Sequence, residues 1–326
     1  MASAATTAAP RQSILRSDAA QKLLAFGALI LIFAFFSFAS PVFFTWENIK
    51  GILLATAVNG ILALGVTFII ITAGIDLSVG TVMTLCAVMT GVAITNLGLP
   101  IPVGILVSLL TGIAAGSVNG FFISRMGIPP FIATLGMMMM ARGLALVISG
   151  VKPIYFNDAP GFRNLTMGTL VADIPNAVII LFVAAIIAAF ILGKTVLGRY
   201  AVAMGSNEEA TRLSGVNVAN WKTAVYALGG FFSGLAGVVI ASRLNSAQPA
   251  LGMGYELDAI AAVVIGGTSL SGGQGTILGT VIGAFIISTL TNGLRILSVP
   301  QEWQMVVTGA IVILAVYLDI VRRRRQ

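Results

Sequence analysis

The sequence predicts an all-α polytopic membrane protein with about ten transmembrane helices. Three observations predict this fold class: apolar residues make up 58% of the 326-residue chain, charged residues make up only 9%, and the apolar residues gather in long runs. Soluble domains carry about 25% charged residues, so this chain has too few charges to cover a surface that faces water. The mean hydropathy of +1.02 agrees with that conclusion.

The apolar runs define the predicted spans, because about 20 mostly apolar residues are needed to cross the hydrocarbon core of a bilayer. Ten runs reach or approach that length: 22–40, 51–73, 78–96, 101–123, 130–149, 175–193, 223–242, 256–270, 276–294 and 303–320. The run at 256–270 is the shortest. The first run is longer than the roughly 7–15 apolar residues of a signal peptide, so we expect it to be retained as a span.

The positive charges predict the orientation of the chain. An even number of spans puts both termini on one side, and placing them in the cytoplasm leaves 12 Lys and Arg residues inside against 5 outside, with Arg142 within a span. Such an excess marks the cytoplasmic side. The chain then divides into a cytoplasmic leader (1–21), a transmembrane domain (22–320) that includes a cytoplasmic segment at 194–222, and a basic cytoplasmic tail (321–326).

Glycines at every fourth position predict close packing of helices, because small residues let helix backbones approach each other in lipid. Two such ladders lie in the fourth and ninth predicted spans: Gly112, Gly116 and Gly120, then Gly275, Gly279 and Gly283. An Asn-Gly pair ends the first ladder and another follows the second, and a proline comes after each pair. An offset of five spans is odd and predicts inverted five-helix repeats, a common transporter design. The alternative is that glycine-rich membrane helices match by chance.

The composition excludes several kinds of site. Histidine is absent and Cys86 is the only cysteine, so the chain has no disulfide framework, no Cys/His zinc site and no histidine general base. We expect no metal and no cofactor, and we expect Cys86 to be a small packed hydrophobe. The net charge of +7 comes from a terminal arginine cluster and from charges scattered at the ends of apolar runs. That distribution is a topology signal and does not predict nucleic-acid binding.

Residues 270–274 read LSGGQ, the signature peptide of the ATP-hydrolysing subunits of ABC transporters. The peptide works there only beside a phosphate loop, and this chain has no G-x-x-x-x-G-K-[ST] sequence. The simpler interpretation is a glycine-rich break between the eighth and ninth spans. We therefore expect this chain to be no enzyme, and ATP hydrolysis to take place in a separate partner.

Two charged residues lie within or between apolar runs. Asp76 follows the second run, and a carboxylate deep in hydrocarbon costs about 2.5–3.5 kcal/mol. It either caps the third span or marks a broken helix that lines a watery cavity or a subunit contact, and the two interpretations are compatible. Arg142 either extends to the outer interface or pairs with Glu256 or Asp258.

The segment at 194–222 is the longest soluble stretch of the chain and reads KTVLGRYAVAMGSNEEATRLSGVNVANWK. About 29 residues are too few for an enzyme domain, which usually needs about 50 or more. They suffice for one or two short helices on the membrane surface, one of them ended by Gly215. This segment predicts a membrane protein that is driven by a soluble partner.

Several long motifs resemble the permease of bacterial ribose ABC importers. They are GIDLSVGT (74–81), PPFIATLGMMMMARG (129–143), GRYAVAMGSNEEATRLSGVNV (198–218), RLNSAQPALGMGYELDAIAAVVIGGTSLSGGQGTILGTVIGA (243–284) and NGLRIL (292–297). The resemblance covers nearly all of the chain except the leader and the 150–174 loop. It implies a protein of the bacterial cytoplasmic (inner) membrane that carries ribose or a related pentose or hexose.

The resemblance also implies partners. Two permease subunits form the pore as a homodimer or heterodimer, a cytoplasmic ABC ATPase binds the coupling helices, and an extracytoplasmic sugar-binding protein delivers the sugar. The EAA-x-x-x-G element of coupling helices corresponds to Glu209, Ala210, Thr211 and Gly215, with Glu208 just before it. Thr211 replaces the second alanine and remains a small residue.

Two further sets of residues complete the expected sites. We expect weak hydrogen-bonding groups to line the sugar path between two copies, near the breaks at 74–80 and 267–275: Asp76, Ser78, Thr81, Thr268, Ser269 and Ser271. We expect charged residues of the outer face to contact the binding protein: Glu47, Lys152, Asp158, Arg163 and Glu302.

Two alternatives stay open from the sequence. An ion-coupled secondary transporter that works without an ATPase suits inverted repeats and Asp76, but it has no need of a docking helix at 194–222. An ABC permease for another small solute is the second alternative, because more distant relatives of the resembling family carry branched-chain amino acids.

Overall fold

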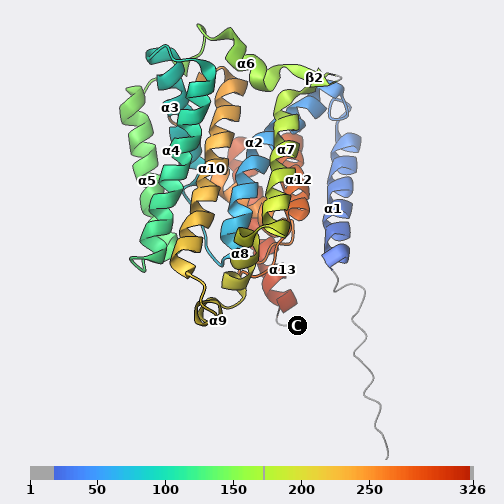
Figure 1. Cartoon of the computed structure of the whole chain (residues 1–326). Coiled ribbons are helices and arrows are strands. Elements are labelled where there is room, and N and C mark those ends of the chain that lie inside the picture. The colour runs from blue at the N-terminus through green and yellow to red at the C-terminus, as the bar shows by residue number, and fades with distance from the viewer. Residues whose placement is uncertain (1–17, 172, 324–326) are drawn as a thin grey trace, which may run out of the picture.

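The computed structural model describes residues 18–171 and 173–323. Most of the expected leader (residues 1–17), Ala172 and the last three residues of the expected basic tail (324–326) lie outside the described residues. The described chain is almost entirely helical, as the sequence predicts (Figure 1).

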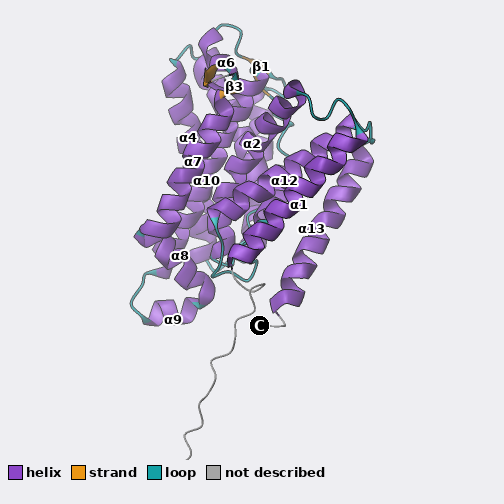
Figure 2. Ribbon diagram, turned by 90° about the vertical axis from the view of Figure 1, so that its right-hand side faces the viewer, coloured by secondary structure: helices purple, strands orange, loops and turns teal. Residues whose placement is uncertain are grey.

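The helices follow one another in the order α1 (Asp18–Ala39), α2 (Trp46–Ile71), α3 (Val79–Gly91) with its π-helical continuation η2 (Val92–Asn96), α4 (Ile101–Ser124), α5 (Pro130–Ser149), α6 (Pro160–Met167), α7 (Asn176–Lys194), α8 (Val196–Ser206), α9 (Glu208–Leu213), α10 (Val218–Leu244), α11 (Tyr255–Ile265), α12 (Ile277–Ile296) and α13 (Gln301–Arg323). Figure 2 shows α1 and α13 beside α12 at one edge of the bundle.

Short strands lie at one end of the bundle. Strand β1 (Ile154–Tyr155) pairs antiparallel with β4 (Ser246–Ala247), and β2 (Thr169–Val171) pairs antiparallel with β3 (Ile174–Pro175). Figure 1 shows α6 and β2 at this end, with α8, α9 and the end of α13 at the opposite end. The molecule therefore has two polar ends that are separated by the length of the helices.

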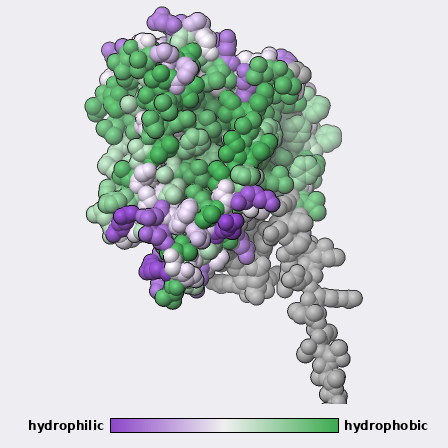
Figure 3. Space-filling view, viewed as in Figure 1, coloured by the Kyte–Doolittle hydropathy of each residue, from purple (hydrophilic) through white to green (hydrophobic). Residues whose placement is uncertain are grey.

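Each of the ten predicted runs is wholly or partly helical in the described residues, but only seven helices there are long and apolar enough to cross a membrane. These are α2, α3 with η2, α4, α5, α7, α10 and α12. Figure 3 shows the corresponding band of apolar surface between two more polar ends. The structure thus agrees with a polytopic membrane protein, with seven candidate crossings among the described residues.

Helix α2 lies in the centre of the bundle. From Thr56 to Ile71 every residue of α2 is buried. Helix α10 packs along α2, and α3, α4, α7, α11 and α12 surround this central pair. A helix that is apolar on all sides can face either lipid or protein. The contacts of α2, and not its composition, place it at the core: α7 is more apolar but is less buried.

The glycine ladder of α4 packs against α10. A Cβ atom at Gly112 would overlap the carbonyl oxygen of Gly230, and one at Gly116 would overlap that of Tyr226. Ser108 joins the same seam by donating a hydrogen bond from Oγ to the Gly234 carbonyl oxygen at 2.9 Å. The seam joins two backbones directly, as the four-residue spacing predicts.

The second ladder differs from its prediction in one position. Gly279 and Gly283 lie on α12, against the backbone of Gly266 and Ala262 at the end of α11. Gly275 precedes α12 and belongs to the loop, where it faces Ile71 and Thr268. Thr276 begins the helix because its Oγ1 accepts a hydrogen bond from the Gly279 amide at 3.2 Å.

The predicted span at 256–270 is wrong in its extent. Helix α11 has 11 residues, which at 1.5 Å per residue is about 16 Å, half of a hydrocarbon core of about 30 Å. The chain before α11 is not helical and follows α3: Ala247 lies beside Gly91, and Gly252 lies beside Gly80. Residues 266–276 after α11 are also non-helical, so the predicted run 256–270 is a half-length helix followed by a loop.

Candidate functional site

The polar segment at 194–222 forms two short helices, α8 and α9, as the sequence predicts. Its local structure follows from its caps. Asn207 begins α9 because its Oδ1 accepts a hydrogen bond from the Ala210 amide at 2.9 Å, and Glu208 and Glu209 occupy the first turn, where negative charge is favourable. Gly215 follows the helix with a φ of +84°, the left-handed backbone that we expected there.

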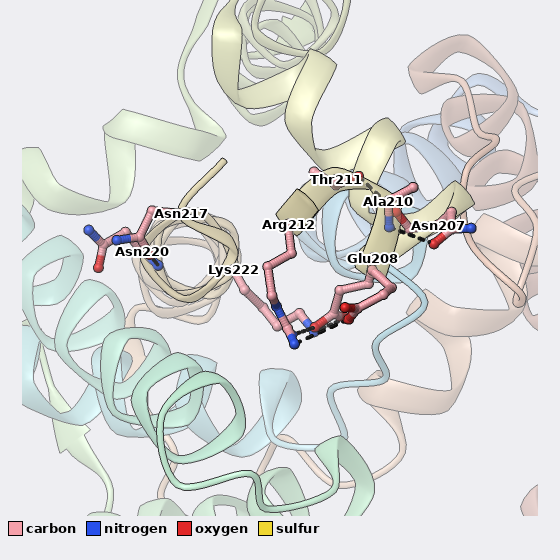
Figure 4. A network of polar contacts seen from close by, with 9 residues as sticks. Asn207, Glu208, Ala210, Thr211, Arg212, Asn217, Asn220 and Lys222 are labelled. Carbon is pink, nitrogen blue, oxygen red and sulfur yellow. Dashed lines mark hydrogen bonds and ion pairs between the residues drawn. The ribbon is translucent and has the colours of Figure 1, made fainter. Parts of the chain in front are cut away.

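One ion pair, between Glu208 and Lys222, joins α9 to the start of α10, and Arg212 pairs with both glutamates within α9 (Figure 4). Lys222 Nζ on α10 lies 2.6 Å from Glu208 Oε2, and Arg212 lies 3.2 Å from Glu208 and 3.3 Å from Glu209. Exposed ion pairs contribute only about 0–1 kcal/mol each, and the side chain of Lys222 is the most buried of the set at 14% exposure. The network therefore orients α9 more than it stabilises the fold.

The expected coupling residues differ in what they offer to a partner. Thr211 is buried against the protein, while Ala210 and Gly215 are exposed and the Glu209 side chain is 67% exposed. Glu208 is committed to Lys222. Glu209 is therefore the acidic side chain of this element that is freer to meet another subunit.

The sequence reasoning missed Leu213, the last residue of α9. Its exposed fraction is 80%, although it is the only large apolar residue on a helix that is otherwise polar. The available signal was the single leucine in the otherwise polar sequence EEATRL. An apolar residue on a short, water-facing helix adds nothing to the fold and therefore indicates another role. Because burying an exposed leucine side chain is favourable, this position suits insertion into an apolar pocket of a partner.

Asp76 lies in the break between α2 and α3 and is buried. Its Oδ1 accepts hydrogen bonds from the Ser78 amide at 2.7 Å and from Ser78 Oγ at 2.6 Å, and Asn119 Nδ2 on α4 donates to Ser78 Oγ at 3.0 Å. Burial raises the pKa of Asp76, and the hydrogen bonds from Ser78 and Asn119 oppose that rise. The carboxylate thus binds an amide at the start of α3, as the capping interpretation predicts, but it does so inside the protein.

The remaining residues of the expected path are also placed by the structure. Thr81, Thr268 and Ser269 are buried, and Ser271 is exposed. Within the described residues, Thr268 Oγ1 and Ser269 Oγ have no hydrogen-bond partner. The hydroxyl groups therefore do not line an open channel in this conformation.

The LSGGQ peptide forms part of the break between α11 and α12, as we expected, and this break meets the break after α2. The Gly273 amide donates a hydrogen bond to the Ile71 carbonyl oxygen at 2.8 Å, and a Cβ atom at Gly272 would lie 2.9 Å from the Ala73 nitrogen. The two glycine-containing breaks are therefore neighbours at the end of α2.

All five residues that we expect to contact a binding protein are exposed: Glu47, Lys152, Asp158, Arg163 and Glu302. Only Glu47 forms an ion pair among the described residues, with Lys50 at 2.7 Å. Arg163 lies on α6, so the expected 150–174 loop contains a helix that the sequence reasoning missed. Pro160 at its first turn was the available signal.

Helix α6 is sealed onto the bundle by its buried side. Phe162 and Phe156 are fully buried with ring centroids 4.3 Å apart, and Ser242 Oγ on α10 donates to the Phe162 carbonyl oxygen at 2.6 Å. Thr166 and Ser242 share a further hydrogen bond of 2.7 Å. This end of the molecule is thus closed by a packed cap.

The proposed pairing of Arg142 with an acidic residue of the eighth run is not formed. Arg142 is exposed on α5 and has no ion pair within the part of the chain that the structure describes. Glu256 instead accepts a hydrogen bond from the Gly254 amide at 3.1 Å, at the start of α11.

Comparison with known proteins identifies the family. Residues 48–316 match the family described as branched-chain amino acid transport system / permease component. The chain is 43% identical to the ribose import permease protein of Haemophilus influenzae over 90% of this chain and 91% of that protein. It is also 43% identical to the ribose import permease protein of Bacillus subtilis over 92% of each chain.

A xylose transport system permease protein of Escherichia coli is 34% identical, over 96% of this chain and 95% of that protein. No solved structure matches. The apolar helices and these relatives describe a multi-pass protein of the bacterial inner membrane. The chain therefore belongs to this permease family, as a membrane-embedded transport subunit of the ribose-permease type.

Proposed function

We propose that this chain is the membrane-spanning permease of an ATP-driven importer for a monosaccharide, with ribose as the first candidate and other pentoses or hexoses next. The observation that carries the proposal is the 43% identity to ribose import permeases along nine-tenths of the chain. Xylose is a further candidate substrate, because one relative is a xylose transport system permease protein. In this proposal the chain itself hydrolyses no ATP.

The arrangement in the membrane is part of the proposal. Ten crossings, with α1, α11 and α13 added to the seven long apolar helices, place both termini and α9 in the cytoplasm. Inverted repeats are supported by matched pairings: α4 packs along α10 and α12 along α2, while α3 packs on α4 and α11 on α12. The two interrupted helix pairs, α2–α3 and α10–α11, then correspond to each other.

Coupling is proposed to run through α9. A cytoplasmic ABC ATPase would bind the surface of Glu209, Ala210 and Leu213, while Glu208 and Thr211 hold the helix in place and Gly215 ends it. A projection that is joined to α10 by the Glu208–Lys222 ion pair and exposes one large apolar side chain suits docking onto a separate subunit.

The sugar path is proposed to lie between two copies of the chain, near the breaks at 72–78 and 266–276. Asp76, Ser78, Thr81, Thr268 and Ser269 are buried, so the described conformation would be a closed one that must open before these groups meet a sugar. An uncharged polyhydroxyl solute needs weak hydrogen-bonding groups along its path. On the opposite side, the exposed charges Glu47, Lys152, Asp158, Arg163 and Glu302 would receive an extracytoplasmic sugar-binding protein.

Reconstitution of the chain in liposomes, with its ATPase and sugar-binding protein, tests this function. We expect uptake of radiolabelled ribose that needs both partners and ATP on the side of the membrane where the ATPase is bound. Xylose and leucine measured in parallel distinguish a second pentose and the class of solute named in the family description. Uptake by the chain alone, driven by an ion gradient, would contradict the proposal and favour a secondary transporter.

A further inference from the structure

Three segments that are far apart in the sequence meet at the last carbonyl group of α2. The final carbonyl groups of a helix have no partner within the helix and need one from elsewhere. The end of α2 satisfies two of them locally: the Ala73 amide donates to the Ile70 oxygen at 2.9 Å, and the Gly74 amide donates to the Ile69 oxygen at 3.1 Å. The Ile71 oxygen accepts instead from the Gly273 amide, at 2.8 Å.

The end of α8 closes over this hydrogen bond. A Cβ atom at Gly205 would overlap the Ile71 oxygen and would lie 2.5 Å from the Gly273 nitrogen. Ser206 follows it, with its Oγ 2.5 Å from where a Cβ of Gly273 would be. The end of α8, in the segment at 194–222, therefore contacts the end of α2 and the loop before α12 directly through backbone atoms.

The loop between α11 and α12 has a backbone conformation that permits the same contact. Gly272 and Gly273 have φ values of +83° and +75°, a left-handed backbone that strains residues other than glycine. A Cβ atom at Gly272 would also lie 2.8 Å from the Gly205 oxygen. The glycines of the LSGGQ peptide thus serve a junction between α2, α8 and the loop before α12.

We propose that Gly205 is a positioning residue for coupling, and that the end of α8, the Gly272–Gly273 turn and the end of α2 move as one rigid unit. This inference rests on the proposed function. Interlocked backbones cannot absorb a displacement by changing rotamers, so movement of α8 passes directly to Ile71. The break after α2 then transmits this displacement to α4 and α5. Ser78 is hydrogen-bonded to Asn119 of α4, and the Leu77 amide donates a hydrogen bond to Thr134 of α5 at 3.2 Å.

The first test compares Gly205→Ala with Gly193→Ala in the reconstituted complex. Gly193 lies at the same end of the molecule, and a Cβ atom there meets nothing within 4 Å. We expect Gly205→Ala to bind the ATPase through its unaltered α9 but to lose about fivefold or more of the hydrolysis stimulated by sugar-loaded binding protein, since a backbone hydrogen bond is displaced. Gly193→Ala should match the wild type. Stimulation in Gly205→Ala within about twofold of the wild type would overturn the inference.

The second test needs no substitution. Hydrogen exchange of the wild-type complex is measured over peptides that contain Gly273, without nucleotide and with a non-hydrolysable ATP analogue. A unit that moves rigidly keeps the Gly273 amide equally protected in both states, whereas faster exchange with nucleotide means that the junction opens and the inference is wrong. A wild-type chain that stimulates no ATPase overturns the proposed function, and the inference with it. Normal wild-type stimulation with an opening junction overturns the inference alone.

Discussion

Helices α6 and α9 lie at opposite ends of the molecule (Figure 1). Helix α6 is packed onto the bundle, whereas α9 is held by a few polar contacts. The cap at α6 buries Phe156, Phe162 and Thr166 completely. Of the six residues of α9, only Thr211 is buried, and one ion pair, Glu208 to Lys222, joins the helix to α10. The contrast indicates that one end is built to close the protein and the other to present side chains to a partner.

The largest expected effect is at the α6 cap. Phe162→Ala removes a fully buried aromatic ring, and such truncations cost about 3–5 kcal/mol. We expect a clear loss of thermal stability in detergent and faster proteolysis within 150–174. Leu170→Ala is the control, because Leu170 is 79% exposed and surface substitutions usually change stability by less than about 0.5 kcal/mol. Equal stability of the two variants would mean that α6 is not a sealed cap.

The next effect is expected at the tip of α9. Leu213→Asp should leave the unfolding temperature unchanged, since Leu213 is 80% exposed, but should weaken ATPase association by about tenfold or more, the effect of losing an apolar anchor. Co-purification with the ATPase at graded concentrations measures this loss. Ser214→Asp places the same charge on the neighbouring exposed position and should bind nearly normally. Unchanged binding in Leu213→Asp would exclude Leu213 as an anchor.

A smaller effect is expected from Glu209→Lys. The variant should insert and bind the ATPase, yet uptake per ATP hydrolysed should fall about two- to fivefold, because a charge that faces the partner is reversed. Glu208→Gln is the informative comparison: it removes a contact of Lys222 inside the subunit, so it should loosen α9 and raise its hydrogen exchange. If Glu209→Lys takes up as much sugar per ATP hydrolysed as the wild type, Glu209 does not contribute to the interface with the ATPase.

The smallest effect is expected on the outer face. Reversing Lys152, Asp158 and Arg163 together should raise the binding-protein concentration needed for half-maximal uptake about twofold at low salt, and less at high salt, because exposed charges mainly steer encounter. A titration of binding protein at two ionic strengths measures this. An effect that is the same at both ionic strengths would indicate lost packing instead of lost steering.

Much of the fold could be predicted because long apolar runs are a strong local signal. All of 101–123 and 130–149, for example, are helical within one residue of the predicted bounds. The run at 256–270 failed because composition cannot distinguish a half-length helix from a full one. Gly266, which follows the last residue of α11, lies against the backbone of Gly279 on α12, a tertiary contact that composition does not reveal.

The site could be predicted in part for the same reason. The acidic turn of α9 and the left-handed Gly215 are local features, and both could be read from the sequence. The junction of Gly205, Ile71 and Gly273 could not, because the contact joins backbones of three distant segments and leaves no side-chain pattern. The burial of Thr268 and Ser269 is likewise a tertiary property that hydroxyl chemistry does not reveal.

The glycine seam between α4 and α10 has a thermal consequence. Helices that meet inside lipid release little ordered water, so the heat capacity of the seam hardly changes when it forms. The proposed docking of a soluble subunit onto α9 would remove apolar surface from water and would carry a negative heat-capacity change. The free energy of the α4–α10 contact should therefore change little with temperature, whereas the affinity of a soluble subunit for α9 should depend on temperature more strongly.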